Sequence, residues 1–159
     1  MIGYSLGGRV AIGLLRAAPE RFRAATILSA HPGLTDPRQR AERREMDAQW
    51  SRLLRTRGIG AFVDAWERQP LFRSQSRLSA EVLHRQRERR LRQRPEGLAN
   101  ALESLGLGSM PSAWDAVQTY PGRLRWIVGA EDSKDLDSGQ RLKSLRPQTE
   151  LRVLDEVGH

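Results

Sequence analysis

The sequence of 159 residues contains no cysteine, three histidines, two lysines and no long apolar run. The absence of cysteine excludes disulfides, thiolate zinc sites and a cysteine nucleophile. The histidines, His31, His84 and His159, leave little room for a histidine metal site, so no metal is expected. No apolar stretch approaches the roughly 20 residues of a membrane span, so we expect no membrane insertion. The 38% of hydrophobic residues and the 14 glycines predict an ordinary globular chain with a workable core.

The positive charge is concentrated in one internal segment. The chain has 27 basic and 19 acidic residues, a net charge of +8. Residues 36–94 contain 16 arginines and 8 acidic residues, so they hold the whole excess. Such a segment favours an anionic partner, and a module that binds nucleic acid is one hypothesis. Against it, glutamates alternate with arginines at i,i+4 spacing, as in Glu81–Arg85 and Glu88–Arg92, and no nucleic-acid motif is present. We therefore expect no nucleic-acid partner.

Strand and helix patterns alternate at both ends of the chain, whereas its middle has only helix patterns. Short apolar runs typical of buried parallel strands occupy residues 1–4, 24–29, 124–129 and 151–154. Helices are expected over residues 6–17, 36–57, 58–67, 79–94, 95–105 and 136–145. The pattern predicts an α/β protein, a parallel sheet with flanking helices that carries an all-helical cap insertion. The expected boundaries are 1–32 and 118–159 for the α/β core and 33–117 for the cap.

A nucleophile motif lies between the first strand and the first helix. Residues 3–7 read Gly-Tyr-Ser-Leu-Gly and match G-x-S-x-G, whose glycines allow a sharp turn that projects the hydroxyl of Ser5. The helix N-terminus favours negative charge, and the backbone N–H of Leu6 can donate to an oxyanion. The alternative is a tight glycine turn with an incidental serine.

Partners for Ser5 follow the order Ser, Asp, His that this motif predicts. Asp132 comes directly after the strand 124–129, at the carboxyl end where α/β sites collect, and His159 follows the strand 151–154. Glu131, Asp135 and Asp137 lie at similar distances and remain rivals for the acid. For His31 we expect packing at the rim of a pocket, and for His84 a solvated helix surface.

Further motifs give the chain a family resemblance. They are residues 3–9, 31–34 and 41–43, Trp66 with residues 69–72, and residues 95–99 and 131–134. With these segments, the sequence resembles the 2-succinyl-6-hydroxy-2,4-cyclohexadiene-1-carboxylate synthases of menaquinone and phylloquinone biosynthesis, over essentially its whole length. That family is a group of lyases on an α/β-hydrolase fold.

The resemblance implies a reaction and a set of binding residues. The family eliminates pyruvate from a succinyl-enolpyruvyl-hydroxycyclohexene-carboxylate, a small polycarboxylate. Carried over, Ser5 removes a ring proton with the help of His159 and Asp132, without an acyl-enzyme. The implied substrate-binding residues are Tyr4, Arg9, Arg43, Trp66 and Arg90. No cofactor is implied, the expected location is the cytoplasm, and the oligomeric state stays open. The alternative is another enzyme of this fold, an esterase or a C–C hydrolase.

The sequence also departs from the family pattern. Asp135 and Leu136 follow Lys134, where the family usually carries an aromatic residue. The chain opens at the nucleophile motif, so the strands before it and the loop with the second oxyanion donor are missing, as is the helix after the histidine. We therefore expect the isolated 159-residue chain to be poorly soluble and inactive, because its sheet would expose unpaired edges.

Overall fold

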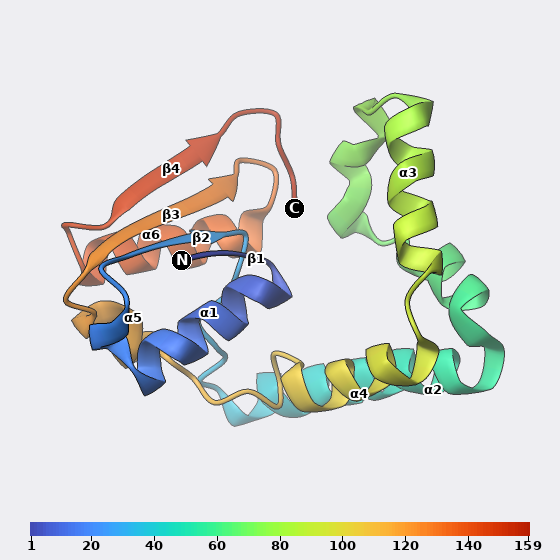
Figure 1. Cartoon of the computed structure of the whole chain (residues 1–159), viewed down its shortest axis with the longest axis horizontal. Helices are drawn as coiled ribbons and strands as arrows, with labels where there is room; N and C mark the ends of the chain where they lie inside the picture. Colours follow the sequence, from blue (N-terminus) through green and yellow to red (C-terminus); the bar gives the residue numbers. More distant parts are fainter. The chain divides into compact units, whose positions relative to one another are not determined.

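The computed structural model describes all 159 residues, which divide into two compact units (Figure 1). The sheet unit comprises Met1–Gly33 and Pro111–His159, and the helical unit comprises Leu34–Met110. Gly33 and residues 111–117, expected in the cap, thus fall in the sheet unit. None of the helices is both long and apolar enough to cross a membrane.

Four parallel strands form the sheet, in the order β1-β2-β3-β4. The strands are β1 (Ile2–Tyr4), β2 (Ala24–Leu28), β3 (Arg123–Gly129) and β4 (Glu150–Leu154). Gly3 pairs with Ile27, which pairs with Trp126, which pairs with Leu151, so the register is continuous across the sheet. The α/β class predicted from the sequence is confirmed.

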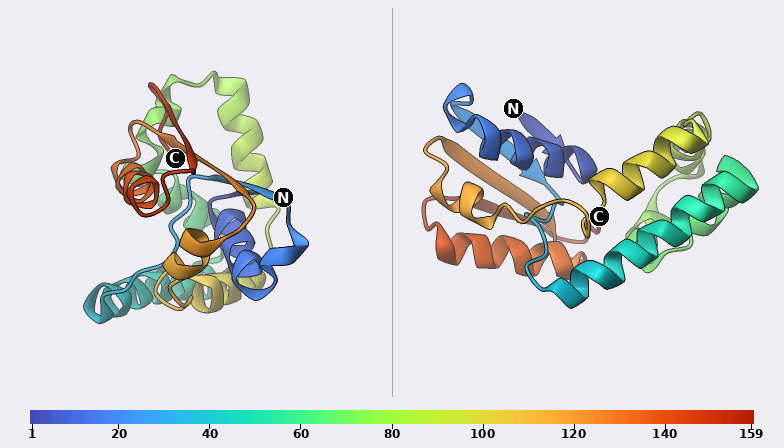
Figure 2. Two further views of the ribbon diagram at one scale, coloured as in Figure 1. Left: turned by 90° about the vertical axis from the view of Figure 1, so that its left-hand side faces the viewer. Right: turned by 90° about the horizontal axis from the view of Figure 1, so that it is seen from below.

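Three helices cover one face of this sheet (Figure 2, right view). They are α1 (Leu6–Ala17), α5 (Trp114–Thr119) and α6 (Ser133–Leu145), and a short 3-10 turn, η1 (Pro19–Arg21), follows α1. Alternate strand residues face these helices, so Ile27, Trp126 and Val128 are fully buried. Leu15 of α1 and Leu142 of α6 complete this core, while Thr26, Leu28 and Ile127 of the other sheet face are only partly buried.

The helical unit is built from α2 (Pro37–Trp66), the 3-10 segment η2 (Pro70–Arg77), α3 (Ala80–Leu91) and α4 (Pro95–Leu105). Asp36 caps α2: its carboxylate accepts a hydrogen bond from the N–H of Arg38 at 2.8 Å, and Pro37 is the first helical residue. Helical geometry breaks at Gly58, with φ 76° and ψ −179°, a conformation that glycine adopts without strain. The two helices expected on either side of this position therefore occur as one element with a break.

A second apolar core lies between α2 and α4. Leu54, Phe62, Val63 and Ala99 are buried, and Trp50 and Trp66 pack against them. On the surface of these helices, Arg55 pairs with Glu96 and Glu103. The predicted i,i+4 pairs of α3 are present, Arg85 with Glu81 at 2.6 Å and Arg92 with Glu88 at 3.9 Å.

Candidate functional site

The turn from β1 to α1 forces Ser5 into an unusual backbone conformation. Ser5 has φ 51° and ψ −117°, in the region that side chains rarely adopt, and its N–H donates to the carbonyl oxygen of Leu28 at 2.9 Å. A Cβ on Gly3 would lie 2.5 Å from the carbonyl oxygen of Gly7, and one on Gly8 would lie 2.6 Å from the Cβ of Ala30. Glycine at positions 3 and 8 thus allows the strand, the helix and the β2 end to approach closely, with Ser5 at the corner.

A chain of two hydrogen bonds connects Ser5, His159 and Asp132. The hydroxyl oxygen of Ser5 lies 2.8 Å from Nε2 of His159, and Nδ1 of His159 lies 2.8 Å from Oδ2 of Asp132. With Nδ1 protonated toward the carboxylate, the lone pair of Nε2 faces the serine hydroxyl and can accept its proton. The three side chains come from the ends of three different strands, which the parallel sheet brings to one edge.

Close backbone approach fixes His159 at this edge. The N–H of Glu131 donates to the carbonyl oxygen of Val157 at 2.9 Å, and the N–H of Ala130 donates to that of Leu154 at 2.9 Å. A Cβ on Gly129 would lie 2.2 Å from the carbonyl oxygen of Val157, so only glycine lets the segment before His159 come so near. The ring of His159 is also 5.5 Å from the ring of Tyr4.

Burial and charge act in opposite directions on this histidine and its partner. Burial alone would lower the pKa of His159, but hydrogen bonds and Coulomb attraction from Asp132 and Asp135 outweigh it and raise the pKa to about 9. Burial alone would raise the pKa of Asp132, but the hydrogen bond and the charge of His159 outweigh it, so the pKa lies below its usual value. Asp132 therefore stays ionised over the range in which the imidazole titrates.

Asp132 has a structural task besides holding His159. It is the N-cap of α6, and its Oδ1 accepts a hydrogen bond from the N–H of Asp135 at 3.4 Å. Asp132 therefore caps α6 through Oδ1 and contacts His159 through Oδ2. Of its rivals, Glu131 and Asp137 are exposed, whereas Asp135 is buried and its Oδ2 is 3.5 Å from Nδ1 of His159.

Leu6 and Arg9 lie on the first turns of α1, directly after the serine. The N–H of Leu6 is the first of the helix and has no acceptor within it, as an oxyanion donor requires. Arg9 is half-buried, and its charge acts on His31. Burial lowers the pKa of His31, with Arg141 and Arg9 adding to this effect and Asp135 opposing it. Tyr4, Leu6 and Arg9 thus share the sheet unit with the hydrogen-bonded chain.

The remaining predicted residues belong to the helical unit. Arg43 of α2 is held by Asp47, one turn later, whose carboxylate oxygens both lie 3.0 Å from its Nε. Trp66 ends α2 and stacks on Phe62, with ring centroids 5.1 Å apart. Arg90 of α3 donates to Glu67 at 2.8 Å, and its guanidinium lies 5.2 Å from the centroid of the Phe72 ring. Each of these side chains has a structural partner within the helical unit.

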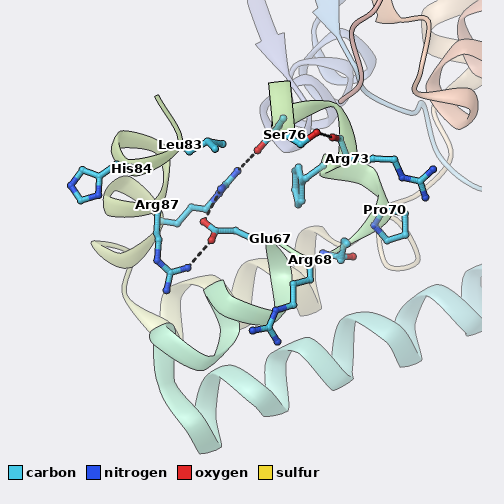
Figure 3. Close-up of a pocket in the computed structure, with 12 residues that line it drawn as sticks. Glu67, Arg68, Pro70, Arg73, Ser76, Leu83, His84 and Arg87 are labelled. Atoms are coloured by element: carbon cyan, nitrogen blue, oxygen red, sulfur yellow. Dashed lines mark hydrogen bonds and ion pairs between the residues drawn. The ribbon is translucent and has the colours of Figure 1, made fainter. Parts of the chain in front are cut away.

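A pocket of about 560 Å³ opens in the helical unit, between the end of α2, η2 and α3 (Figure 3). Its lining is rich in arginine and comprises Glu67, Arg68, Gln69, Pro70, Phe72, Arg73, Gln75, Ser76, Leu83, His84, Arg87 and Arg90. Glu67 pairs with both Arg87 and Arg90, so it neutralises part of this charge. His84, predicted at the surface, is exposed and also borders the pocket. The sequence singled out Arg90 here but not the pocket itself, because the pocket forms only where the end of α2, η2 and α3 come together in space.

Asp132, Asp135 and His159 also offer ligand atoms of the kind that bind divalent ions, all within 4.8 Å of one another. Both ring nitrogens of His159 are already engaged, Nδ1 with Asp132 and Nε2 with Ser5. An ion on either nitrogen would have to displace one of these hydrogen bonds. The arrangement therefore fits proton transfer better than metal binding.

Comparison with known proteins finds relatives that match the whole chain. The chain is 33% identical over 159 residues to 2-succinyl-6-hydroxy-2,4-cyclohexadiene-1-carboxylate synthase of Escherichia coli O1:K1, covering 100% of the chain and 60% of that protein. It is 36% identical over 159 residues to a Bacillus subtilis (strain 168) protein that provisionally bears the same name, covering 100% of the chain and 58% of that protein. The chain thus spans less than two thirds of the length of these relatives.

Comparison with solved structures and with a family model identifies the fold and the family of the chain. The fold matches MenH from S. aureus with a TM-score of 0.95 and 32% identity, over 99% of this chain and 59% of that one. A thermophilic esterase from Thermogutta terrifontis matches with a TM-score of 0.82 at 21% identity, over 99% of this chain and 56% of that one, which shows a common fold alone. The model of the alpha/beta hydrolase family matches residues 1–159. The chain therefore belongs to the alpha/beta hydrolase family.

Proposed function

We propose that this chain carries the active-site serine, acid and histidine of a 2-succinyl-6-hydroxy-2,4-cyclohexadiene-1-carboxylate synthase, a lyase that eliminates pyruvate from a succinyl-enolpyruvyl-hydroxycyclohexene-carboxylate. The observation that carries the proposal is the chain of two 2.8 Å hydrogen bonds from Ser5 through His159 to Asp132, at a strained turn. It is supported by the names of relatives that are 33% and 36% identical across the whole chain.

Proton transfer through these three residues would start the reaction. Neutral His159 takes the hydroxyl proton of Ser5 at Nε2, and the serine oxygen removes a proton from a ring carbon of the substrate. The electron pair of that C–H bond forms a ring double bond as the C–O bond to the enolpyruvyl group breaks. The leaving enolate takes up the proton that His159 holds and departs as pyruvate, which restores the neutral imidazole, and no bond between Ser5 and the substrate forms.

Positive charge would hold the substrate carboxylates. Arg9 lies one turn after Ser5 on α1, close enough to the serine to serve a bound anion. Arg43 and Arg90 each keep a planar guanidinium in a fixed place through Asp47 and Glu67, and such a group binds carboxylates with paired hydrogen bonds. Tyr4 and Trp66 would contact the ring. A small polycarboxylate is thus the proposed partner, and the cytoplasm the proposed location.

Pyruvate release tests this proposal. The chain, and the longer protein if the gene extends upstream of residue 1, would be incubated with the enolpyruvyl substrate and the pyruvate measured by a coupled reduction. We expect release that falls about 10²- to 10⁴-fold in Ser5→Ala, the range typical of a positioned base. Ser112→Ala, which changes a serine outside the hydrogen-bonded chain, is the matched control.

A second assay separates the lyase from an esterase of the same fold. p-Nitrophenyl acetate would be offered to the same preparations. Strong ester turnover without pyruvate would overturn the proposal in favour of the esterase or C–C hydrolase alternative. Pyruvate release that Ser5→Ala leaves unchanged would overturn the role of Ser5.

A further inference from the structure

A second carboxylate lies beside the imidazole of His159. Asp135 is the third residue of α6, and only 7% of its surface is exposed. Its Oδ2 is 3.5 Å from Nδ1 of His159, the same nitrogen that lies 2.8 Å from Asp132. The Nδ1–H group of His159 therefore faces two carboxylates. The carboxylate of Asp132 lies at hydrogen-bond distance, and that of Asp135 lies close enough to attract the positive charge of the ring.

Helix capping does not account for the direction of this side chain. An acidic residue at the third helical position commonly reaches back to the backbone N–H of the N-cap residue. Here the N–H of Asp132 already donates to the carbonyl oxygen of Gly129 at 3.2 Å. The carboxylate of Asp135 is instead turned to His159, while its own N–H donates to Oδ1 of Asp132.

Burial makes the contact with His159 necessary. A carboxylate removed from water is costly unless a charge or a hydrogen-bond donor faces it. The N-terminus of α6 supplies part of this compensation to both acids, because its dipole favours negative charge. The imidazolium of His159 supplies the rest, since it is the cation paired with both Asp132 and Asp135.

We propose that Asp135 is a positioning residue that shares with Asp132 the task of orienting and charging His159, so that the loss of either acid alone leaves the imidazole in place. This inference rests on the proposed function, in which His159 accepts the proton of Ser5.

Other charged groups are the same in all the variants below. His31, on the loop after β2, interacts electrostatically with Asp135, and Arg141 of α6 and Arg9 of α1 act on His31 in turn. Nδ1 of His31 accepts a hydrogen bond from the N–H of Gly33 at 3.0 Å, which fixes its ring. These groups affect wild type and variants alike.

Titration of His159 by NMR tests the proposal without relying on catalysis. The chain has three histidines, and His159→Gln identifies the signal of His159. We expect wild-type His159 to titrate at about pH 9. In Asp135→Asn its midpoint should fall by about one pH unit, the lower end of the effect of an adjacent charge. In Asp132→Asn it should stay above that of a free histidine, about 6.5, because Asp135 remains. Only the double variant should fall to about 6.5 or below.

Control variants separate this role from a merely structural one. Asp137→Asn removes an exposed acid from the same helix and should leave the midpoint unchanged. Asp135→Leu removes the charge without a buried amide and keeps the test available if Asp135→Asn does not fold. A midpoint in both Asp135 variants equal to that of wild type would overturn the proposal. So would a midpoint at or below 6.5 in Asp132→Asn alone.

The rates of pyruvate release give a second and distinguishable result. We expect Asp132→Asn to lose far less than the roughly 10⁴-fold typical of a triad with one acid, and the double variant to lose the full factor. A full loss in Asp132→Asn alone would contradict shared positioning. If the longer protein, with its strands before residue 1 present, releases no pyruvate while the titrations behave as expected, the proposed reaction fails and the role of Asp135 stands.

Discussion

The imidazole of His159 points its Nε2 at the hydroxyl of Ser5, 2.8 Å away across 154 positions of sequence. Nothing in the local sequence of either residue brings them together. The parallel sheet does, because β1 and β4 run in the same direction and end at the same edge. Under the proposed function, this contact makes the protonation of His159 the property that governs the reactivity of Ser5.

Reactivity of Ser5 should therefore rise with pH. Only neutral His159 accepts a proton, and its two carboxylates raise its pKa to about 9, so most molecules carry the inactive imidazolium at pH 7. We expect the rate of pyruvate release, or of labelling by a fluorophosphonate, to increase nearly tenfold per pH unit from about pH 7 and to level off near pH 9. His84→Gln is the control, because His84 is exposed on α3. A flat profile between pH 7 and 9 would contradict the assignment.

The same pKa predicts how stability varies with pH. A group whose pKa is raised on folding stabilises the fold below its unfolded pKa, and this stabilisation disappears as the pH rises through the folded value. For His159 the window runs from about 6.5, the free-histidine value, to about 9. We expect the free energy of unfolding, measured by urea denaturation, to decline across this window in wild type and to vary less in His159→Gln. An equal decline in both proteins would assign the effect to other groups.

Steric demands at the turn distinguish the glycines around Ser5. A Cβ on Gly3 would approach backbone atoms at 2.5 and 2.8 Å, whereas one on Gly7 would meet nothing within 4 Å. Gly3→Ala should lower the free energy of unfolding by about 1–3 kcal/mol and abolish fluorophosphonate labelling of Ser5. Gly7→Ala lies in the first turn of α1 and should keep labelling, with stability unchanged or higher by up to about 1 kcal/mol. Equal damage from both variants would show that the space around Gly7 is also needed.

The sequence predicted the elements on either side of Ser5 but not which of the neighbouring glycines are sterically required. The motif of residues 3–7 and the apolar runs predicted the strands, the helix at 6–17 and the α/β class, because those signals are local. The motif did not show that Gly8 rather than Gly7 is sterically required, because the atom it would meet, the Cβ of Ala30, belongs to another segment.

The sequence did not predict where α6 begins, and the choice of the acid that contacts His159 therefore stayed open. The sequence placed the helix at Leu136, its first apolar residue, whereas α6 begins at Ser133 with a polar first turn. This earlier start puts Asp132 and Asp135 on one turn of helix, where both reach His159. Spacing alone gave four rival acids, and only the three-dimensional position of His159 separates them.

We expect substrate binding by Arg43 to depend on Asp47, the acid that fixes its guanidinium. Asp47 is 2% exposed and grips Arg43 at an i,i+4 spacing, a signal that the sequence contains. Under the proposed function, Arg43→Lys should raise KM about tenfold with little change in kcat, because lysine cannot form the paired contact with a carboxylate. Asp47→Asn should raise KM in the same direction by loosening the guanidinium. Gln49→Ala, an exposed position on the same helix, is the control, and an unchanged KM in Arg43→Lys would remove Arg43 from the binding site.

Apolar packing, rather than the conspicuous ion pairs, should hold the helical unit together. Leu54 is 1% exposed and lies in the core between α2 and α4, so Leu54→Ala should lower the free energy of unfolding by about 2–5 kcal/mol. The adjacent Arg55 binds Glu96 and Glu103 at the surface, where water and salt screen the attraction. Arg55→Met, which keeps the aliphatic part of the side chain, should therefore have a much smaller effect. Urea denaturation followed by tryptophan fluorescence at low and at 0.5 M salt measures both variants. Two results together would contradict this expectation: Arg55→Met at low salt lowers the free energy of unfolding as much as Leu54→Ala, and 0.5 M salt lowers that of the wild type by the same amount. The arginine network would then be the main stabilising feature of this unit.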